Sequence, residues 1–292
     1  MIIHGVSIHT GGGKVLLDQL LTDETLGKIS HLICDQRYLL PSKISNKVVI
    51  HRIQPTLKSR IKAEFLLKEI ASKSPDEKIL CFSNLPPIFK LPNPVILFLQ
   101  NALILKGVPQ YAENLKVKLR ILYEKIWFNF FLKNACEVWV QTEWMKDKFL
   151  EYYNLKILVK PIVLNLPPPI PASIKRYDFI SVSGSAPHKH LLDLVLAWKL
   201  LPEPRPKLLI IGDKPNNEIK AALDQITDGS VMFVTDVMRK ELFNYYQESR
   251  ALILTSKLES YCLPLYEAKH FQLKVLAPNE RYVLEADRKS VV

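Results

Sequence analysis

Short apolar segments alternate with amphipathic segments along the whole chain. In the first half, the runs typical of β-strands are "MIIHGVSI", "HLICD", "VVIHRI", "KILCFS", "PVILFLQ" and "EVWVQT". In the second half they are "YDFISVSG", "KLLIIGD", "SVMFVTD", "ALILTS" and "KVLAP", and helix-like segments such as "LLDLVLAWKLL", "NEIKAALDQI" and "RKELFNYYQESR" separate several of them. Strands regularly spaced by helices predict parallel sheets with helical crossovers, and hence an α/β fold.

One proline-rich segment interrupts this alternation. "LPPPIPASIK", residues 166–175, contains four prolines and cannot continue a helix or a central strand. We therefore predict two doubly wound α/β domains, residues 1–165 and 176–292, joined by this linker. In such sheets ligands bind beyond the carboxyl ends of the strands. The natural site of a two-domain chain is then the cleft between the domains.

Charge is distributed unequally between the two parts. Residues 1–175 carry 24 Lys+Arg and 14 Asp+Glu, a balance of +10, whereas residues 176–292 carry 16 and 15, a balance of +1. This asymmetry predicts an anionic partner for the first part, which could be a membrane surface, a nucleic acid or a polyanionic substrate.

Cysteine spacing and hydropathy indicate where the protein resides. The four cysteines are widely separated, so neither a zinc site nor a disulfide framework is predicted, and a reducing cytoplasm is the simplest location. The chain does not open with a signal-peptide pattern, and it has no apolar run of the roughly 20 residues that a bilayer span requires. We expect a cytoplasmic protein, either soluble or attached to the inner face of the membrane.

Glycines follow the first predicted strand. "HTGGGKVLLDQLL" places Gly11, Gly12 and Gly13 before the first helix, where their backbone could approach an anion closely. A tight turn is the alternative, since the later glycine and the acidic residue of a dinucleotide fingerprint are absent. His9 lies beside these glycines and is a further candidate for ligand contact, although a histidine in this position is often structural.

Two loops of the second half carry further candidates. "SGSAPHKH", residues 183–190, follows the first strand there, and its Lys189 could reach a phosphate or could simply be solvated. In "LTSKLESYCLPLYEA", Pro264 suits the first position of a helix, which puts Glu267 one turn into that helix and Glu259 in the preceding loop. The free amides of such a helix start can bind an anion. The alternative is helix-end electrostatics, worth roughly 0.3–1 kcal/mol.

Residues 115–133, "LKVKLRILYEKIWFNFFLK", combine basic and aromatic side chains. Leu115, Leu119, Leu122 and Ile126 recur at helical spacing, so we predict that they face the core. A helix at a membrane surface and a core helix with a solvated basic face both fit the pattern. The charge asymmetry favours the membrane surface. A nucleic acid is not predicted as a partner, since no DNA- or RNA-binding module is visible.

The second half resembles the retaining nucleotide-sugar glycosyltransferases of the GT-B fold, of the group 1 type. Their signature is two glutamates separated by seven residues, and here it reads "ESYCLPLYE", from Glu259 to Glu267. "FISVSGSAPHKHLLDLVLAWKLL" looks like the start of their donor domain, with Lys189 at the position of the phosphate-binding lysine. "HTGGGKVLLDQLL" and "VWVQTEWM" are similar to stretches of their acceptor domain. The main resemblance covers roughly residues 177–285.

This resemblance implies two Rossmann-like domains facing a central cleft, and transfer of a hexose from a nucleotide diphosphate sugar to a saccharide or lipid-linked acceptor, with retention. It implies no metal and no cofactor. Lys189 would neutralise the departing diphosphate, Glu259 would face the transferred sugar, and Glu267 would accept hydrogen bonds from the ribose. The remaining residues implied are, on the donor side, Ser183, Gly184, Ser260, Tyr261, Cys262 and Leu263, and on the acceptor side, His9, Gly11, Gly12, Gly13 and Asn101.

The sequence departs from the family pattern in several places. Glycines are usual at Ser260 and Cys262, and an arginine is usual near Ser185. The sequence ends soon after "NERYVLEA", before the strand–helix segment with which the family continues, so a short or truncated variant is expected. Two other functions therefore stay open: a non-catalytic relative that binds a nucleotide or glycan, and a sugar-nucleotide epimerase.

Overall fold

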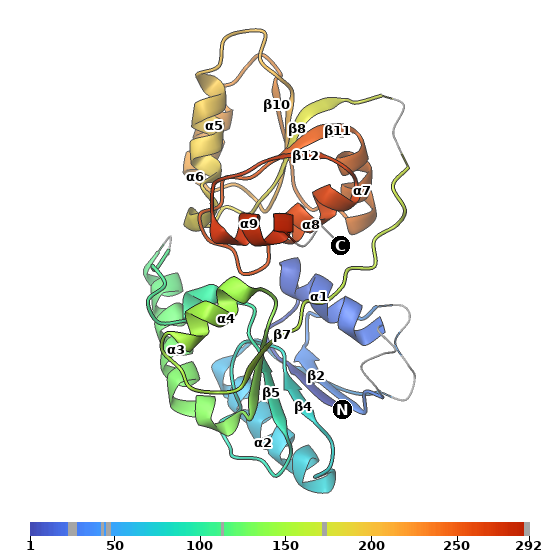
Figure 1. The fold of residues 1–292 in the computed structure, drawn as a ribbon, viewed down its shortest axis with the longest axis vertical. Coiled ribbons are helices and arrows are strands. Elements are labelled where there is room, and N and C mark those ends of the chain that lie inside the picture. The colour runs from blue at the N-terminus through green and yellow to red at the C-terminus, as the bar shows by residue number, and fades with distance from the viewer. Residues whose placement is uncertain (23–27, 42–43, 45–47, 112–113, 171–173, 289–292) are drawn as a thin grey trace. The chain divides into compact units, whose positions relative to one another are not determined.

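The computed structural model describes residues 1–22, 28–41, 44, 48–111, 114–170 and 174–288. The chain divides into two compact units, the first comprising Met1–Pro109 and Lys116–Asn165 and the second Gln110–Leu115 and Leu166–Val292. Each unit contains one sheet with helices packed against it (Figure 1). Residues 171–173 of the expected linker and residues 289–292 of the expected second domain lie outside the described residues.

The first unit is built on a seven-stranded sheet in the order β3-β2-β1-β4-β5-β6-β7. The strands are β1 (Ile2–Gly5), β2 (His31–Asp35), β3 (Val49–Ile53), β4 (Ile79–Cys81), β5 (Val95–Phe98), β6 (Glu137–Val140) and β7 (Ile157–Val159). All are parallel to their neighbours, and Ile2 of β1 lies opposite both His31 of β2 and Ile79 of β4. The strand order reverses between β1 and β4, as in other doubly wound sheets.

Helices connect the strands of this sheet and pack against it (Figure 1). They are α1 (Gly11–Thr22), α2 (Leu57–Lys73), α3 (Leu115–Phe131) and α4 (Glu143–Leu150), with short 3₁₀ turns η2 (Ala102–Ile104) and η3 (Leu132–Asn134). Helix α1 buries a stripe of leucines at i, i+1, i+4 and i+5, namely Leu16, Leu17, Leu20 and Leu21. Threonine side chains cap two helix starts: Thr56 accepts from the amide of Ser59 in α2, and Thr142 from that of Met145 in α4.

Helix α3 corrects one prediction. The apolar stripe expected to face the core lies on the surface: Leu115, Leu119, Leu122 and Ile126 are 70%, 55%, 48% and 59% exposed, and Phe130 continues the stripe at 67%. The helix is anchored instead through its opposite side, by Ile121, Trp127 and Phe128. The spacing correctly identified residues that share a face. The opposite face is the buried one, because its bulky aromatic side chains bury more apolar surface.

The second unit has a five-stranded parallel sheet in the order β10-β9-β8-β11-β12. Its strands are β8 (Tyr177–Val182), β9 (Leu208–Ile211), β10 (Val231–Val234), β11 (Ser249–Ile253) and β12 (Lys274–Leu276). The order reverses between β8 and β11. Ser249 lies opposite Tyr177, and Phe179 lies opposite both Ala251 and Leu208. The predicted α/β class with parallel sheets is confirmed in both units.

The helices of this unit are α5 (Leu191–Lys199), α6 (Asn217–Leu223), α7 (Arg239–Gln247), α8 (Leu263–His270) and α9 (Arg281–Arg288), with a 3₁₀ turn η4 (Pro187–Lys189). Helix α8 begins at Leu263, one residue before the predicted start, so Pro264 is its second residue. It ends in a Schellman motif, in which the amide of Gln272 donates to Lys269 O at 3.0 Å and that of Leu273 to Ala268 O at 2.9 Å. Gln272 takes the left-handed conformation there, with φ of 58°.

Candidate functional site

The loops that follow β8 and β11 are joined at the point where the second sheet reverses. The Thr255 hydroxyl donates to the backbone oxygen of Lys189 at 2.7 Å. The Lys257 amide donates to the backbone oxygen of His188 at 3.0 Å. These two bonds place the predicted phosphate loop directly beside the loop that leads into α8.

The ammonium of Lys189 and the carboxylate of Glu259 form a hydrogen-bonded ion pair across these loops. Their side chains are 24% and 13% exposed, so the pair is accessible from solvent without being fully hydrated. The two residues are far apart in sequence, and their meeting fits the rule that ligands of doubly wound sheets bind at the strand reversal. The structure thus brings together Lys189 and Glu259, which are the two residues with the clearest predicted roles in binding phosphate and sugar.

Backbone conformation shapes the loop that carries Lys189. Pro187 opens the turn η4, and His190 ends it in the left-handed region with φ of 52°. The Ser183 amide donates to Ile211 O at 2.9 Å, which holds the start of the loop against β9. Gly184 permits this path, because a Cβ there would lie 2.9 Å from a carboxylate oxygen of Asp213. Ser183 and Gly184 therefore lie at the foot of the same loop as Lys189.

His188 is a neutral neighbour of the ion pair. Burial and the adjacent Lys189 charge lower its pKa to about 4, although Glu259 acts in the opposite direction. Its Nδ1 is buried and has no hydrogen-bond partner among the described residues. The ring packs against Tyr111, with the ring centroids 5.9 Å apart. An uncharged imidazole therefore lies next to the lysine at physiological pH.

Glu267 is buried in the interface between α7 and α8 and is only 2% exposed. The Tyr246 hydroxyl donates to its Oε2 at 2.9 Å, and Nη2 of Arg239 lies 2.7 Å from its Oε1. Burial, followed by the charge of Glu267, raises the pKa of Tyr246 well above its usual value, so the phenol remains a donor. Sequence reasoning missed both partners. Their signal was the i, i+7 spacing that puts them on one face of α7.

The loop between the two glutamates keeps the backbone of a glycine loop without its glycines. Cys262 has φ of 58° and ψ of 69°, the left-handed conformation that glycine adopts most readily. Its side chain is 5% exposed and belongs to the core. The neighbouring Tyr261 ring stacks on that of Tyr266 with centroids 4.3 Å apart. Ser260 and Leu263, half-buried on either side, complete a loop fixed by its own packing.

In the first unit, His9 and the glycines follow β1 at the reversal of that sheet. Gly13 is closely surrounded, because an added Cβ would lie 3.2 Å from Ile8 and 3.7 Å from the side-chain oxygen of Gln100. Nδ1 of His9 lies 4.0 Å from Oδ2 of Asp35. Arg37 forms hydrogen bonds with both oxygens of Asp35 and lowers the pKa of this carboxyl. Gly11 (φ of 63°) and Gly12 open α1 shortly after His9.

Asn101 has a structural task in this unit. Its Oδ1 accepts from the amide of Leu103 at 3.0 Å and so caps η2. Its own amide donates to Oδ1 of Asn84, which also accepts from the amide of Gln100 at 2.5 Å. Asn84 has φ of 67°. These hydrogen bonds connect the loops after β4 and β5. Because Oδ1 of Asn101 is already bonded, contact with an acceptor substrate would use the side-chain amino group of Asn101.

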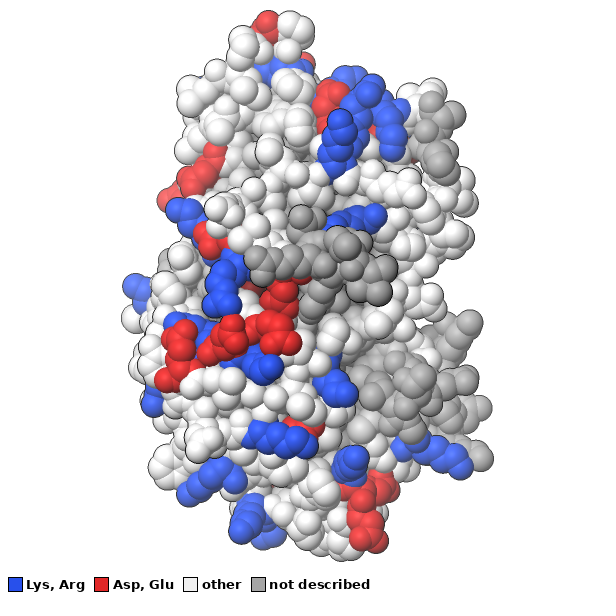
Figure 2. Space-filling model, in the orientation of Figure 1, with Lys and Arg blue, Asp and Glu red and all other residues white. Residues whose placement is uncertain are grey.

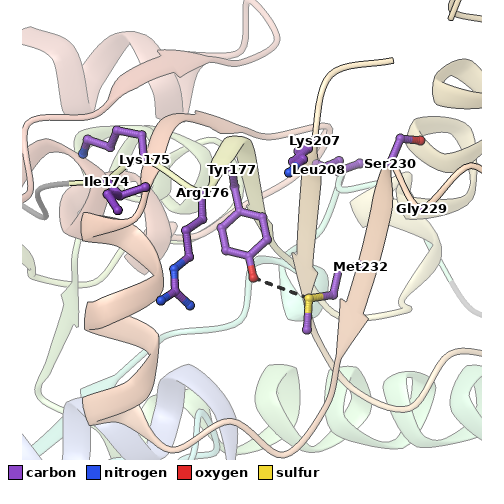
Figure 3. Close-up of a pocket in the computed structure, with 9 residues that line it drawn as sticks. All are labelled: Ile174, Lys175, Arg176, Tyr177, Lys207, Leu208, Gly229, Ser230 and Met232. Carbon is purple, nitrogen blue, oxygen red and sulfur yellow. Dashed lines mark hydrogen bonds between the residues drawn. The ribbon is translucent and has the colours of Figure 1, made fainter. Parts of the chain in front are cut away.

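A separate cavity of about 440 Å³ opens at the amino-terminal ends of β8, β9 and β10. In Figure 3 the Tyr177 hydroxyl points across it toward the sulfur of Met232, at 3.4 Å. Lys175, Arg176 and Lys207 also line it. None of the predicted site residues does. The cavity lies at the amino-terminal ends of the strands, whereas Lys189 and Glu259 follow the carboxyl-terminal ends. It is therefore not the site that the sequence indicated.

No helix in the described ranges is long and apolar enough to cross a membrane. Within the same part of the chain, no three His, Cys, Asp or Glu side chains converge as a metal site would require.

Residues 167–286 match the family model of the glycosyl transferases group 1. This match covers most of the second unit, which is therefore similar to the group 1 glycosyltransferases. The segment contains the whole of the second sheet and every donor-side residue named above, so the predicted resemblance is confirmed. No protein of curated function matches this chain in sequence.

Solved structures establish the GT-B fold. Sucrose-phosphate synthase from Thermosynechococcus elongatus matches with a TM-score of 0.72 and 16% identity, covering 96% of this chain and 82% of that one. WaaG, a glycosyltransferase involved in lipopolysaccharide biosynthesis, matches with a TM-score of 0.64 and 14% identity over 99% and 84%. An α,α-trehalose-phosphate synthase (UDP-forming) from Burkholderia vietnamiensis gives 0.62 and 12% over 99% and 90%. At these identities the likeness is one of fold.

Proposed function

We propose that this protein is a glycosyltransferase. It would move a hexose from a nucleotide diphosphate sugar to a saccharide or lipid-linked acceptor, with retention and without a metal ion, in surface polysaccharide or glycolipid synthesis. The observation that carries the proposal is the Lys189–Glu259 pair at the reversal of the second sheet. A cation and a carboxylate side by side suit a substrate whose phosphates and sugar hydroxyls are adjacent. The UDP-forming relative supports a nucleoside diphosphate as the leaving group.

Each group has a defined task in this proposal. Lys189 neutralises the charge that develops on the departing diphosphate, which is the electrostatic stabilisation such a step needs. Glu259 accepts hydrogen bonds from the hydroxyls of the transferred sugar. Oε1 of Glu267 is buried and accepts no hydrogen bond from the described residues, because its contact with Arg239 lacks hydrogen-bond geometry. A ribose hydroxyl would satisfy it.

The test is calorimetric titration of UDP, GDP and ADP into the wild type and two variants. Lys189→Ala and Glu267→Ala should each bind the preferred diphosphate about ten- to 150-fold more weakly, since a hydrogen bond to a charged group contributes roughly 1.5–3 kcal/mol. Lys207→Ala is a matched control, because it removes an exposed lysine at the opposite edge of the same sheet. Unchanged affinity in both site variants would refute the assignment. A parallel assay of donor hydrolysis separates an enzyme from a relative that only binds.

We also propose that α3 attaches the protein to an anionic membrane surface, where a lipid-linked acceptor would be presented. Leu119, Leu122, Ile126 and Phe130 form an exposed stripe on this helix. Lysines and an arginine flank it, namely Lys116, Lys118, Arg120, Lys125 and Lys133. An apolar stripe bordered by cations matches a helix that lies in the bilayer interface. On the face drawn in Figure 2, acidic and basic side chains are interspersed, so it is this stripe and not a uniform charge that supports the proposal.

A further inference from the structure

Arg239 and Tyr246 hold the two oxygens of Glu267 from a single face of α7. They stand at positions i and i+7 of that helix, and Phe243 lies between them at i+4. The Arg239 guanidinium lies over the Phe243 ring, 5.0 Å from its centroid, which fixes the direction of the side chain. Arg239 is at the start of the helix and is 34% exposed, whereas Tyr246 is fully buried.

This arrangement leaves the Glu267 carboxylate little freedom. A carboxylate that is 2% exposed is costly without a countercharge, and Arg239 supplies one at 2.7 Å. The hydroxyl of Tyr246 occupies Oε2 at 2.9 Å. Oε1 retains its capacity to accept a hydrogen bond. The carboxylate therefore presents one aligned acceptor in a fixed direction.

We propose that Arg239 and Tyr246 are positioning residues that make Glu267 selective for a ribose over a deoxyribose. The inference rests on the proposed function, in which Glu267 accepts from the ribose. A pinned, buried carboxylate cannot turn toward water when the expected hydroxyl is missing. Its Oε1 then receives no hydrogen bond, and a site with such an unsatisfied polar atom discriminates strongly against the analogue that lacks the donor. A mobile carboxylate would bind both sugars more equally.

The experiment measures the ratio of ribonucleotide to deoxynucleotide affinity. Whichever of UDP, GDP and ADP binds most tightly is titrated beside its 2′-deoxy and 3′-deoxy analogues. The wild type should favour the ribonucleotide over at least one analogue by about ten- to 150-fold. Arg239→Ala should weaken ribonucleotide binding until this ratio approaches one, with deoxynucleotide binding unchanged.

Three further variants sharpen the result. Arg239→Lys keeps the positive charge and should retain most of the ratio. Tyr246→Phe keeps the packing but removes the hydroxyl, so it should lower the ratio several-fold, and it carries the test if Arg239→Ala does not fold. Arg176→Ala is the matched control, because it removes an arginine that pairs with Glu248 elsewhere in the same unit. Its ratio should equal that of the wild type.

The possible failures are distinguishable. An unchanged ratio in both Arg239→Ala and Tyr246→Phe overturns the inference, even if the variants are less stable. An equal loss for ribo- and deoxynucleotides in Arg239→Ala also overturns it, because that pattern marks a direct contact with the diphosphate. A wild type that binds both sugars equally overturns the ribose role of Glu267 itself, and the positioning role with it.

Discussion

Lys189 and Glu259 neutralise each other, because the loops after β8 and β11 hold the ammonium against the carboxylate. A diphosphate that binds Lys189 must therefore compete with an internal partner. In the proposed function, Glu259 would therefore weaken nucleotide binding as well as bind the transferred sugar. Removing the charge of Lys189 should therefore weaken diphosphate binding, whereas removing the charge of Glu259 should strengthen it.

Glu259→Gln should accordingly tighten the binding of a free nucleoside diphosphate while lowering the rate of sugar transfer. A partly exposed ion pair contributes about 0.2–1 kcal/mol, so the gain in affinity should be no more than about fivefold. Calorimetry gives the affinity and a donor-hydrolysis assay the rate. Glu248→Gln, which breaks the Arg176 pair, is the control and should alter neither. Weaker diphosphate binding by Glu259→Gln would contradict this interpretation.

Gln272→Gly should stabilise the second unit by about 1 kcal/mol. Gln272 is the left-handed residue of the Schellman motif at the end of α8, and its side chain is exposed. Glycine removes the steric cost of that conformation without removing buried contacts. Urea unfolding followed by circular dichroism measures the change. Gln272→Ala keeps the steric cost and should bring no such gain, so equal stability of the two variants would count against the explanation.

His188 should make the protein less stable as the pH falls. Its pKa is about 4 in the folded protein, against an ordinary value of 6.5. Between these values the unfolded chain takes up a proton that the folded chain does not, so stability is fully present above about pH 6.5 and is lost toward pH 4. The groups that set this pKa besides burial are Lys189, Glu259 and His190.

Urea midpoints at pH 7 and pH 5 check this expectation. The wild type should lose more stability between the two pH values than His188→Gln, which has no proton to gain. His4 is buried too and its pKa is lowered by burial, so both proteins retain its contribution and only their difference is informative. An identical loss in the two proteins would show that His188 does not titrate in this range.

Ile126→Glu should abolish binding to anionic vesicles. It puts a negative charge in the exposed stripe of α3, where burial in the interface requires an apolar side chain. Wild-type binding should also fall steeply with salt, because each basic residue contributes about 1 kcal/mol near an anionic surface and screening sets in within about 8 Å. Co-sedimentation measures both effects. Leu57→Glu, at an exposed leucine of α2, is the control. A wild type that ignores the vesicles at low salt would refute membrane attachment.

The strand pattern could be predicted because buried parallel strands are nearly continuous apolar runs. The exception is β7, whose three residues Ile157–Val159 pair with β6 alone at the edge of the sheet. So short a run, followed closely by Pro161, resembles a loop. In α3 the sequence revealed which residues share a face but not what that face meets. The orientation of α3 is set by Trp127 and Phe128, which are buried in the core on its other face.

The candidate site could be predicted only in part. Lys189 and Glu259 were found through their motifs, and the sheet order then explained why they meet. Arg239 and Tyr246 were missed: their i, i+7 spacing places them on one face of α7, but their contact with Glu267 depends on how α7 packs against α8. The left-handed backbone of Cys262 could not be predicted either. A glycine is the usual sequence signal for this conformation, and here a residue with a buried side chain adopts it.

The exclusively parallel pairing of both described sheets has a consequence for how the chain reaches its native state. Parallel neighbours cannot be joined by a tight hairpin, so each pairing must wait for a crossover to form. In the first sheet Ile2 must find Ile79 before the central strands are complete. High contact order of this kind slows folding and prolongs the exposure of unpaired strand edges. We expect refolding from urea to be slow and prone to aggregation at high protein concentration, and chaperones to raise its yield.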